Sequence, residues 1–416
     1  MNMSNKIIEK NGQYYKFGLY GFLKNLRFYE SFLILFFLEK GIDYLKIGFL
    51  YSIREIAIIL LEIPSGLIAD VLGRKKTLMA ALFFYMISFG IFYFSDHYFL
   101  MVIAMLIYAI ADAFRTGIHK AMIFQYIKSR GRSDQKADYY GHTRSWSQTG
   151  SAVSSLLAAA MVFYYGSYKI IFAASVIPYI LDFILISTYP HFLNGEIQHK
   201  GQLSLWGKTR YIFRVFYMSF KKIEFLKSLT NLSLYTGYYR AVKDYIQPIM
   251  MSFAVALPLF SNLHKKQKTA LVVGILYFFI YLLTAYTSRH AGQFKALYSH
   301  YAKPMNMTLI AGLAAGFISG LFYSANLFWV SIIIFILILM IENLRKPIGV
   351  SYVSELSHDE AMATVLSVQS QSQSLFAAII APMVGFTAQY AGVGTGIAIT
   401  SAILLLLFPV YRLKEK

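Results

Sequence analysis

The chain has 416 residues, of which 57% are hydrophobic and only 14% are charged. The core of a soluble domain needs less apolar surface than this, so the composition favours a polytopic membrane protein. The sequence contains no cysteine, which excludes a disulfide framework, thiolate metal sites and a cysteine nucleophile.

Apolar runs recur along the chain at about 20 residues each, the length that crosses a bilayer. The expected spans are about 17–38, 45–68, 78–95, 99–119, 141–165 and 169–189, then about 229–250, 269–287, 305–323, 327–350, 363–388 and 392–411. The first run lacks a small-residue cleavage site, so we expect a permanent helix and not a signal peptide. The sequence therefore predicts an all-α membrane protein with twelve transmembrane helices.

The net charge of +19 is unevenly distributed over the connections between these runs. When the cations are assigned to alternating connections, most fall on one side, and the other side receives only Lys40, Lys46, Lys169, Lys265, Lys266 and Lys268. The positive-inside rule then places both termini in the cytoplasm. Topology and contact with anionic lipid headgroups explain the basic balance, so we expect no nucleic-acid partner.

A basic turn lies between the second and third runs, in the segment EIPSGLIADVLGRKKTL, residues 62–78. Its characteristic residues are Gly66, Asp70, Gly73, Arg74, Lys75 and Lys76. This spacing resembles the signature of the cytoplasmic turn between helices 2 and 3 in the major facilitator superfamily of membrane transporters. One position departs from that signature, because Val71 stands where a basic residue usually follows the aspartate. The resemblance implies that Asp70 and Arg74 brace the cytoplasmic ends of two bundles in an outward-open state.

Residues 191–227 form a long basic connector near the midpoint of the chain. We therefore expect an N-terminal six-helix bundle over 1–190, a cytoplasmic linker over 191–227 and a C-terminal six-helix bundle over 228–416. This is the layout of the same superfamily, which implies two bundles that move around a shared site in a monomeric protein.

Ionisable residues inside the spans are costly in a bilayer and therefore mark a functional site. In helix 1, Lys24, Arg27 and Glu30 recur at a spacing of three and share one face. The resemblance implies that helices 1, 4, 7 and 10 line a central cavity. The residues assigned to that substrate cavity are Arg27, Arg115, Tyr239, Arg240, Lys243, Arg345 and Lys346.

Carboxylates in the spans are candidates for proton coupling, because burial and a nearby cation change their proton affinity in opposite directions. The candidates are Glu30, Asp112, Asp182, Asp244 and Glu342. Arg240 and Asp244 stand four residues apart and can pair. On helices 1, 4, 7 and 10, the six cations of the cavity set outnumber the four candidate acids Glu30, Asp112, Asp244 and Glu342. Spare positive charge there would attract an anionic or zwitterionic solute. The alternative is that each cation is neutralised by a neighbouring acid as a structural pair.

No His-Glu-x-x-His, Gly-x-Ser-x-Gly or P-loop motif occurs, so we expect neither an enzyme nor a bound cofactor or metal. The resemblance implies a secondary active transporter of the cell membrane that moves a small organic solute by alternating access, with proton coupling. Two functions of this class are considered: transport of an anionic or zwitterionic solute, and, as the alternative, proton-driven efflux of drugs. A non-transporting receptor or scaffold is the alternative from another class, and such a protein would be expected to carry a soluble domain or long interaction tail.

Overall fold

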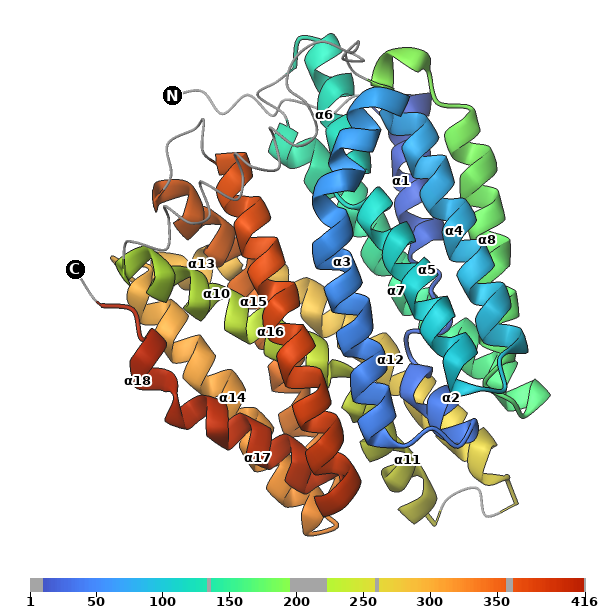
Figure 1. Cartoon of the computed structure of the whole chain (residues 1–416), viewed down its shortest axis with the longest axis vertical. Coiled ribbons are helices and arrows are strands. Elements are labelled where there is room, and N and C mark those ends of the chain that lie inside the picture. The colour runs from blue at the N-terminus through green and yellow to red at the C-terminus, as the bar shows by residue number, and fades with distance from the viewer. Residues whose placement is uncertain (1–9, 133–135, 195–222, 259–261, 357–361, 415–416) are drawn as a thin grey trace.

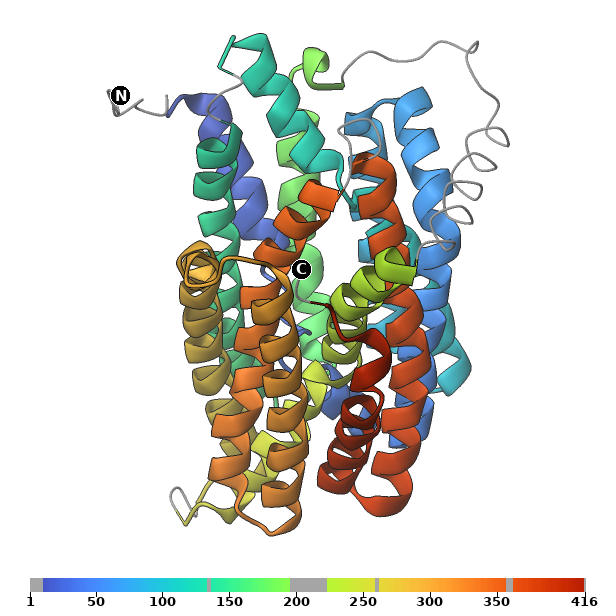
Figure 2. The ribbon, with the colours of Figure 1, turned by 90° about the vertical axis from the view of Figure 1, so that its left-hand side faces the viewer.

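A computed structural model describes residues 10–132, 136–194, 223–258, 262–356 and 362–414. Over these residues the regular elements are helices, arranged in two groups that lie side by side (Figure 1). In Figure 2 the C-terminal group, coloured yellow to red, lies in front of the N-terminal group. The all-α fold expected from the apolar runs is confirmed.

The first group contains the elements that follow, in chain order: α1 (Gly12–Lys24), α2 (Leu33–Glu39), α3 (Tyr44–Leu72), α4 (Arg74–Phe94), α5 (Tyr98–Arg115), α6 (Ile118–Ser129), α7 (Lys136–Tyr165), α8 (Ile170–Ser187) and the short η2 (His191–Asn194). The second contains α10 (Ile223–Val242), η3 (Lys243–Tyr245), α11 (Ile246–Ala256), α12 (Lys265–Arg289), α13 (Ala291–Ala296), α14 (Ala302–Ser324), α15 (Phe328–Leu356), α16 (Met362–Ala391), α17 (Val393–Leu406) and α18 (Phe408–Tyr411). The expected linker falls largely on 195–222, outside the described residues.

Apart from the turn at Leu407 that separates α17 from the short α18 in the last span, three of the twelve expected spans are interrupted helices, which the apolar runs did not indicate. The first span consists of α1 and α2, separated by turns over residues 25–32. The fourth breaks between α5 and α6, where Gly117 adopts a left-handed φ of 78°. The seventh breaks at η3, between α10 and α11. Each break follows or contains charged residues of the expected cavity set, so the irregular backbone and the charges lie together.

A helix break inside a membrane leaves backbone groups that need hydrogen-bond partners. Gln247 of α11 satisfies two such groups in the break of the first span. Its side-chain oxygen accepts a 2.9 Å hydrogen bond from the Ile34 amide, and its nitrogen donates one of 2.9 Å to the Glu30 carbonyl. The buried amide thereby joins the two bundles at their irregular segments.

Seven helices in the described part of the chain are long and apolar enough to cross a membrane. The interrupted α1–α2 and α10–α11 segments are outside this set, as are the long helices α3 and α7. These four segments all supply side chains to the cavities between the bundles. The polar and charged residues of these segments therefore belong to the site between the bundles.

The two bundles make close contact along α3 with α16 and along α7 with α12 (Figure 1). Glycines permit this approach: a Cβ on Gly48 would lie 2.5 Å from the Ala381 carbonyl oxygen, and one on Gly385 would lie 2.5 Å from that of Tyr44. Small residues let membrane helices pack backbone against backbone. The α3–α16 contact therefore depends on the absence of side chains at these two positions.

One end of the interface is closed by contacts around Glu39, at the end of α2. Its carboxylate pairs with the Lys266 ammonium at 2.5 Å and accepts a hydrogen bond of 3.1 Å from the Tyr168 amide. Lys266 also donates to the Gly166 carbonyl at 3.0 Å. Because Lys266 lies in the first turn of α12 in the second bundle, these contacts hold the two bundles together at this end.

Candidate functional site

The largest described cavity has a volume of ≈ 470 Å³ and lies between the two bundles. It is lined by α1 and the following break, by α7, by α10 with η3, and by α12 and α15. Tyr140 and Arg144 near the start of α7 contribute to it, as do Asn343 and Lys346 in the later part of α15. The first cavity is therefore on the side of the interface away from the Glu39 contacts, toward the end of the molecule that bears the N-terminus.

A second cavity of ≈ 330 Å³ is lined by α3, α5 and α16 together with the same two helix breaks. Five lining residues belong to both cavities: Arg27, Glu30, Tyr239, Lys243 and Asp244. Three residues expected in the cavity and two candidate carboxylates therefore meet at one place, where the first and seventh spans are interrupted.

The two cavities differ in charge. The charged residues that line the first are Lys24, Arg27, Arg144, Lys243 and Lys346 with Glu30 and Asp244, five cations and two acids. Those of the second are Arg27, Arg54, Arg240 and Lys243 with Glu30, Glu55, Glu62, Asp112 and Asp244, four cations and five acids. The first cavity thus has an excess of positive charge that the second cavity lacks.

The shared wall of the cavities contains an ion-pair network between the bundles. Lys243 of η3 lies 2.9 Å from a Glu30 oxygen and 3.8 Å from one of Asp244. Arg27 lies 3.9 Å from the other Glu30 oxygen. The Tyr51 hydroxyl donates to Asp244 at 2.9 Å. Glu30 and Lys243 are 213 residues apart, and their contact connects the breaks of the first and seventh spans.

Arg240 makes a second connection between the bundles. Its guanidinium lies 3.0 Å from the carboxylate of Glu55, which also pairs with Arg54 at 2.8 Å. It donates further to Ser374 at 2.9 Å. The expected Arg240–Asp244 pair is wrong, because Arg240 is directed toward α3 and α16 and Asp244 toward Tyr51.

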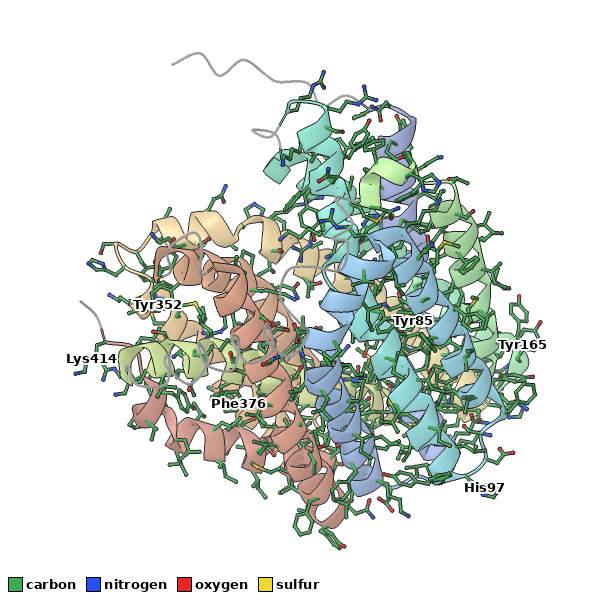
Figure 3. The ribbon with its side chains drawn as sticks, turned by 45° about the horizontal axis from the view of Figure 1, so that its top comes forward. Tyr85, His97, Tyr165, Tyr352, Phe376 and Lys414 are labelled. Atoms are coloured by element: carbon green, nitrogen blue, oxygen red, sulfur yellow. The ribbon has the colours of Figure 1, made fainter. Side chains whose placement is uncertain are left out.

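Arg115, Asp112 and Tyr85 form a closed triangle within the first bundle. The guanidinium lies 2.5 Å from the carboxylate and donates to the Tyr85 hydroxyl at 2.9 Å, while that hydroxyl donates to Asp112 at 2.6 Å. Figure 3 shows Tyr85 inside the N-terminal group of helices, whereas Tyr165 lies at its periphery. Arg115 lines a third cavity of ≈ 140 Å³, which shares Lys24 and Arg144 with the first.

Arg345 is held inside the second bundle. It is 3% exposed, and its guanidinium donates to the Met305 carbonyl, to the Thr308 hydroxyl at 2.7 Å and to the Asn231 carbonyl at 3.0 Å. Glu342 accepts a hydrogen bond of 3.0 Å from the Thr236 hydroxyl. Arg345 lines a fourth cavity of ≈ 170 Å³, so the structure does not bring Arg345 and Arg115 to one cavity.

Three cations of the first cavity make no ion pair with any residue in the described part of the chain: Lys24, Arg144 and Lys346. Of these, the cavity expected from the sequence included only Lys346. Lys24 shares the helix face of Arg27 and Glu30, and this spacing could have identified it. Arg144 begins a polar stripe on α7 with Gln148 and Ser151, and all three line the cavity.

Asp182 lies inside the first bundle, on α8, and its residue is fully buried. Neither carboxylate oxygen has a hydrogen-bond partner among the described residues. The other four candidate carboxylates have partners: Glu30 and Asp112 form ion pairs, and Asp244 and Glu342 accept hydrogen bonds from hydroxyl groups. Asp182 is separate from these contacts.

The basic turn between α3 and α4 is organised by Gly73 and Lys75. Gly73 has φ 86°, a left-handed conformation that favours glycine. The Lys75 ammonium donates to the carbonyl of Ser187, the last residue of α8, at 2.5 Å and to the Tyr189 carbonyl at 2.9 Å. Arg74 reaches the Ala121 carbonyl of α6 at 3.5 Å. The turn is thus fastened to its own bundle through α6 and the segment that follows α8.

Gly66 has open space where a Cβ would lie. The side chain of Asp70 lies outside the described residues, so its bracing role stays a prediction. In the described part of the chain, no group of three or more histidine, aspartate or glutamate side chains is arranged to hold a metal ion.

Membrane-crossing helices in two groups, with a charged cavity between the groups, define a membrane transporter. A model of the Major Facilitator Superfamily matches residues 25–382, and the chain belongs to that family. It is therefore a multi-pass integral membrane protein, as the apolar runs predicted.

Among known proteins, the MFS-type transporter YxaM of Bacillus subtilis strain 168 is 34% identical over 84 residues, which cover 20% of this chain and 21% of the relative. The aligned part is thus about a fifth of that relative's length. The crystal structure of the nucleoside transporter NupG matches 98% of this chain and 100% of its own with a TM-score of 0.74 at 14% identity. A D-xylose-proton symporter matches 97% and 98% with a TM-score of 0.67 at 13% identity. At these identities the solved structures show the shared fold.

Proposed function

We propose that this transporter moves a small anionic or zwitterionic organic solute across the cytoplasmic membrane, with proton coupling. The observation that carries the proposal is the first cavity, where five cations face two acids. The acids are engaged by Lys243, whereas Lys24, Arg144 and Lys346 form no ion pair with the described residues and are therefore proposed to meet the solute. Unpaired cations at a low-dielectric interface favour an anionic group over a neutral or cationic one.

The uncharged part of the solute would meet tyrosines. Tyr239, Tyr277 and Tyr281 line the same cavity and offer hydroxyl groups and ring faces. Two proteins that share the fold are a nucleoside transporter and a D-xylose-proton symporter, whose named solutes are small polar molecules. A lipophilic cation, typical of multidrug efflux, would be repelled by the same five positive charges.

The positive-inside assignment places the basic α3–α4 turn in the cytoplasm. On that assignment, the Glu39 contacts close the external end and the first cavity belongs to an inward-open form. We therefore propose that alternating access breaks the Glu39–Lys266 pair and separates Gly48 from α16. The pair of Lys243 with Glu30 lies at the centre of this movement.

Binding to the purified protein tests the proposal directly. Thermal unfolding is measured with citrate, malate, glutamate, uridine monophosphate, uridine, xylose and tetraphenylphosphonium, and uptake of the most stabilising compounds is measured in proteoliposomes. We expect stabilisation by anions, and weaker binding in Lys346→Gln and Arg144→Gln. A lost charge-assisted contact of about 1.5–3 kcal/mol weakens binding roughly 10- to 150-fold.

Lys265→Gln is the matched control, because it removes one positive charge from the exposed start of α12, away from the described cavities. The control should bind as the unmodified protein does. Stabilisation by tetraphenylphosphonium alone, or anion binding that is equal in all three variants, would contradict an anion site in the first cavity.

A further inference from the structure

The third cavity, of ≈ 140 Å³, lies inside the first bundle and adjoins the first cavity. Its walls are α1, the break between α5 and α6, the start of α6 and the early turns of α7. The residues that line both cavities are Lys24, Tyr140, Arg144 and Ser147. Pockets that hold whole organic ligands have volumes of roughly 300–1,000 Å³, a range that includes the first cavity and not the third. The third cavity therefore suits one polar group of a solute whose larger part lies in the first.

The wall of the third cavity is positively charged. Its lysine and arginine side chains are Lys24, Arg115, Lys120 and Arg144, and no described aspartate or glutamate lines it. Arg115 is engaged by Asp112 at 2.5 Å. The other three cations make no ion pair with any described residue. Three cations without a described counter-charge favour an anionic occupant.

The start of α6 adds backbone donors to the same wall. Its N-cap residue, Gly117, provides no side-chain cap, and the first bond of the helix joins the Ala121 amide to the Gly117 carbonyl at 3.0 Å. The amides of residues 118–120 therefore have no acceptor within α6. Gly117, His119 and Lys120 line the third cavity, so the positive end of the helix lies at its wall. Such helix ends favour phosphate and other oxyanions.

A buried hydroxyl at this cavity lacks an acceptor. Tyr20 is 3% exposed and lines the third cavity, and its hydroxyl has no hydrogen-bond partner among the described residues. Stacking on His119 holds the Tyr20 ring in place, with ring centroids 3.8 Å apart. Buried hydroxyl groups in proteins normally have a partner, because a buried donor without one is costly. An oxyanion in the third cavity would supply the acceptor.

These donors fit a phosphoryl group better than a carboxylate. They come from three directions: from Tyr20 and Lys24 on α1, from Lys120 and the amides at the start of α6, and from Arg144 on α7. A phosphate monoester carries a charge of about −1.5 to −2 at neutral pH and has three acceptor oxygens. A carboxylate carries one charge and has two oxygens, so it would leave more of the three unpaired cations unbalanced.

We propose that the third cavity binds the phosphoryl group of the transported solute, which makes the solute a phosphate monoester whose organic part lies in the first cavity. The Tyr20 hydroxyl donates to a phosphoryl oxygen, and Lys24, Lys120 and Arg144 balance the charge. This assignment rests on the proposed transport of an anionic solute and names the class of that solute.

Tyr20→Phe tests the assignment, because it removes one hydroxyl and keeps the stacked ring. Since that hydroxyl has no described partner in the solute-free protein, the variant should unfold at the same temperature as the unmodified protein or slightly above it. Its binding of inorganic phosphate, uridine monophosphate and glycerol 3-phosphate, measured by calorimetry on the purified full chain, should weaken about 10-fold or more. Tyr245→Phe is the matched control: its hydroxyl is also buried without a described partner, and Tyr245 lines none of the described cavities.

Lys120→Gln tests the charge at the start of α6. Lys120 is exposed, so water screens its charge, and we expect phosphate binding to weaken about 3- to 10-fold. Lys128→Gln, which removes the same charge from the exposed last turn of the same helix, should bind as the unmodified protein does. Uridine lacks only the phosphoryl group of uridine monophosphate. It should bind at least about 10-fold more weakly than the monophosphate and should be insensitive to Tyr20→Phe.

The transport arm measures uptake of the tighter-binding monoester into proteoliposomes, which we expect in the unmodified protein and in Tyr245→Phe. Three results would overturn the assignment: none of the three phosphates binds, they bind equally to Tyr20→Phe and Tyr245→Phe, or the bound monoester is not taken up. Binding of phosphatidylglycerol that depends on Tyr20, without uptake of a monoester, would overturn it in favour of a lipid headgroup. If Lys120→Gln does not fold, Tyr20→Phe decides.

Failure of the proposed function has a different result. If no anion binds, with citrate, malate and glutamate included, the anionic solute and the phosphoryl group are both rejected. If one of these carboxylates binds in a manner that depends on Lys346 while any of the overturning results is found, the anion site of the first cavity stands and the phosphoryl assignment is rejected.

Discussion

Replacement of Arg115 by glutamine tests whether this cation stabilises the fold or binds the solute. The guanidinium makes two charge-assisted contacts, with Asp112 at 2.5 Å and with the Tyr85 hydroxyl at 2.9 Å. Contacts of this kind contribute about 1.5–3 kcal/mol each when they are well shielded from water. The Arg115 and Asp112 side chains are 20% and 26% exposed, so water screens part of the interaction. We therefore expect Arg115→Gln to lower the free energy of unfolding by about 2–3 kcal/mol.

Most of that loss would come from a carboxylate left without its cation, and it should be reversible. The double variant Arg115→Gln with Asp112→Asn removes both charges, so its stability should return to within about 1 kcal/mol of the unmodified protein. Because the chain has no cysteine for a thiol-reactive dye, stability is measured by gel filtration after heating. A double variant no more stable than Arg115→Gln would refute this reasoning.

Transport by the same two variants decides between the two roles of Arg115. If the double variant regains full transport, Arg115 acts only through Asp112 and does not bind the solute. If it is well folded but inactive, the guanidinium contributes to solute binding in the third cavity, where it lies near Lys24 and Arg144.

Three further predictions concern conformation and topology. Gly48→Ala places a Cβ 2.5 Å from a carbonyl oxygen of α16, so it should weaken the contacts that close the external end and reduce transport. The control Gly90→Ala should have a smaller effect, because its Cβ meets nothing within 4 Å. Accessibility of an introduced cysteine at the external end measures the weakening. Asp70→Asn should reduce transport at unchanged expression by favouring inward-open forms, and normal turnover would count against its bracing role. A cysteine at Ser204 should react with a membrane-impermeant reagent only from the cytoplasm, whereas one at Tyr165, 69% exposed at the opposite end, should react only from outside; the reverse pattern would exclude the assigned orientation.

The sequence predicted the membrane fold because the physical requirement for a span is local. About 20 apolar residues suffice to cross a bilayer, and runs such as 78–95 and 305–323 correspond closely to α4 and α14. The family resemblance, based on the turn around Gly73 and on the repeated layout, is confirmed by the match over residues 25–382. Arg27 and Glu30, which share a helix face by their spacing, both line the first cavity.

The sequence could not predict which charges meet, because the partners are distant in the chain. Glu30 and Lys243 are 213 residues apart, and Arg240 and Glu55 are 185 apart. Local spacing instead favoured a pair between Arg240 and Asp244, which the fold does not form. The helix breaks were also missed, because the expected spans were continued through the charged segments that contain them. The partner of the break in the first span, Gln247, comes from the other bundle.

The dependence of the first span on the second bundle has a consequence for biosynthesis. Lys24, Arg27 and Glu30 enter the membrane early, and each ionised residue opposes insertion by about 2.5–3.5 kcal/mol at the bilayer centre. Their described neighbours Lys243 and Gln247 are synthesised more than 200 residues later. We therefore expect the first span to stay beside the insertion machinery, or in a water-accessible position, until the seventh span arrives. Completion of the interrupted helices would then mark the moment at which the nascent protein can be released into the lipid.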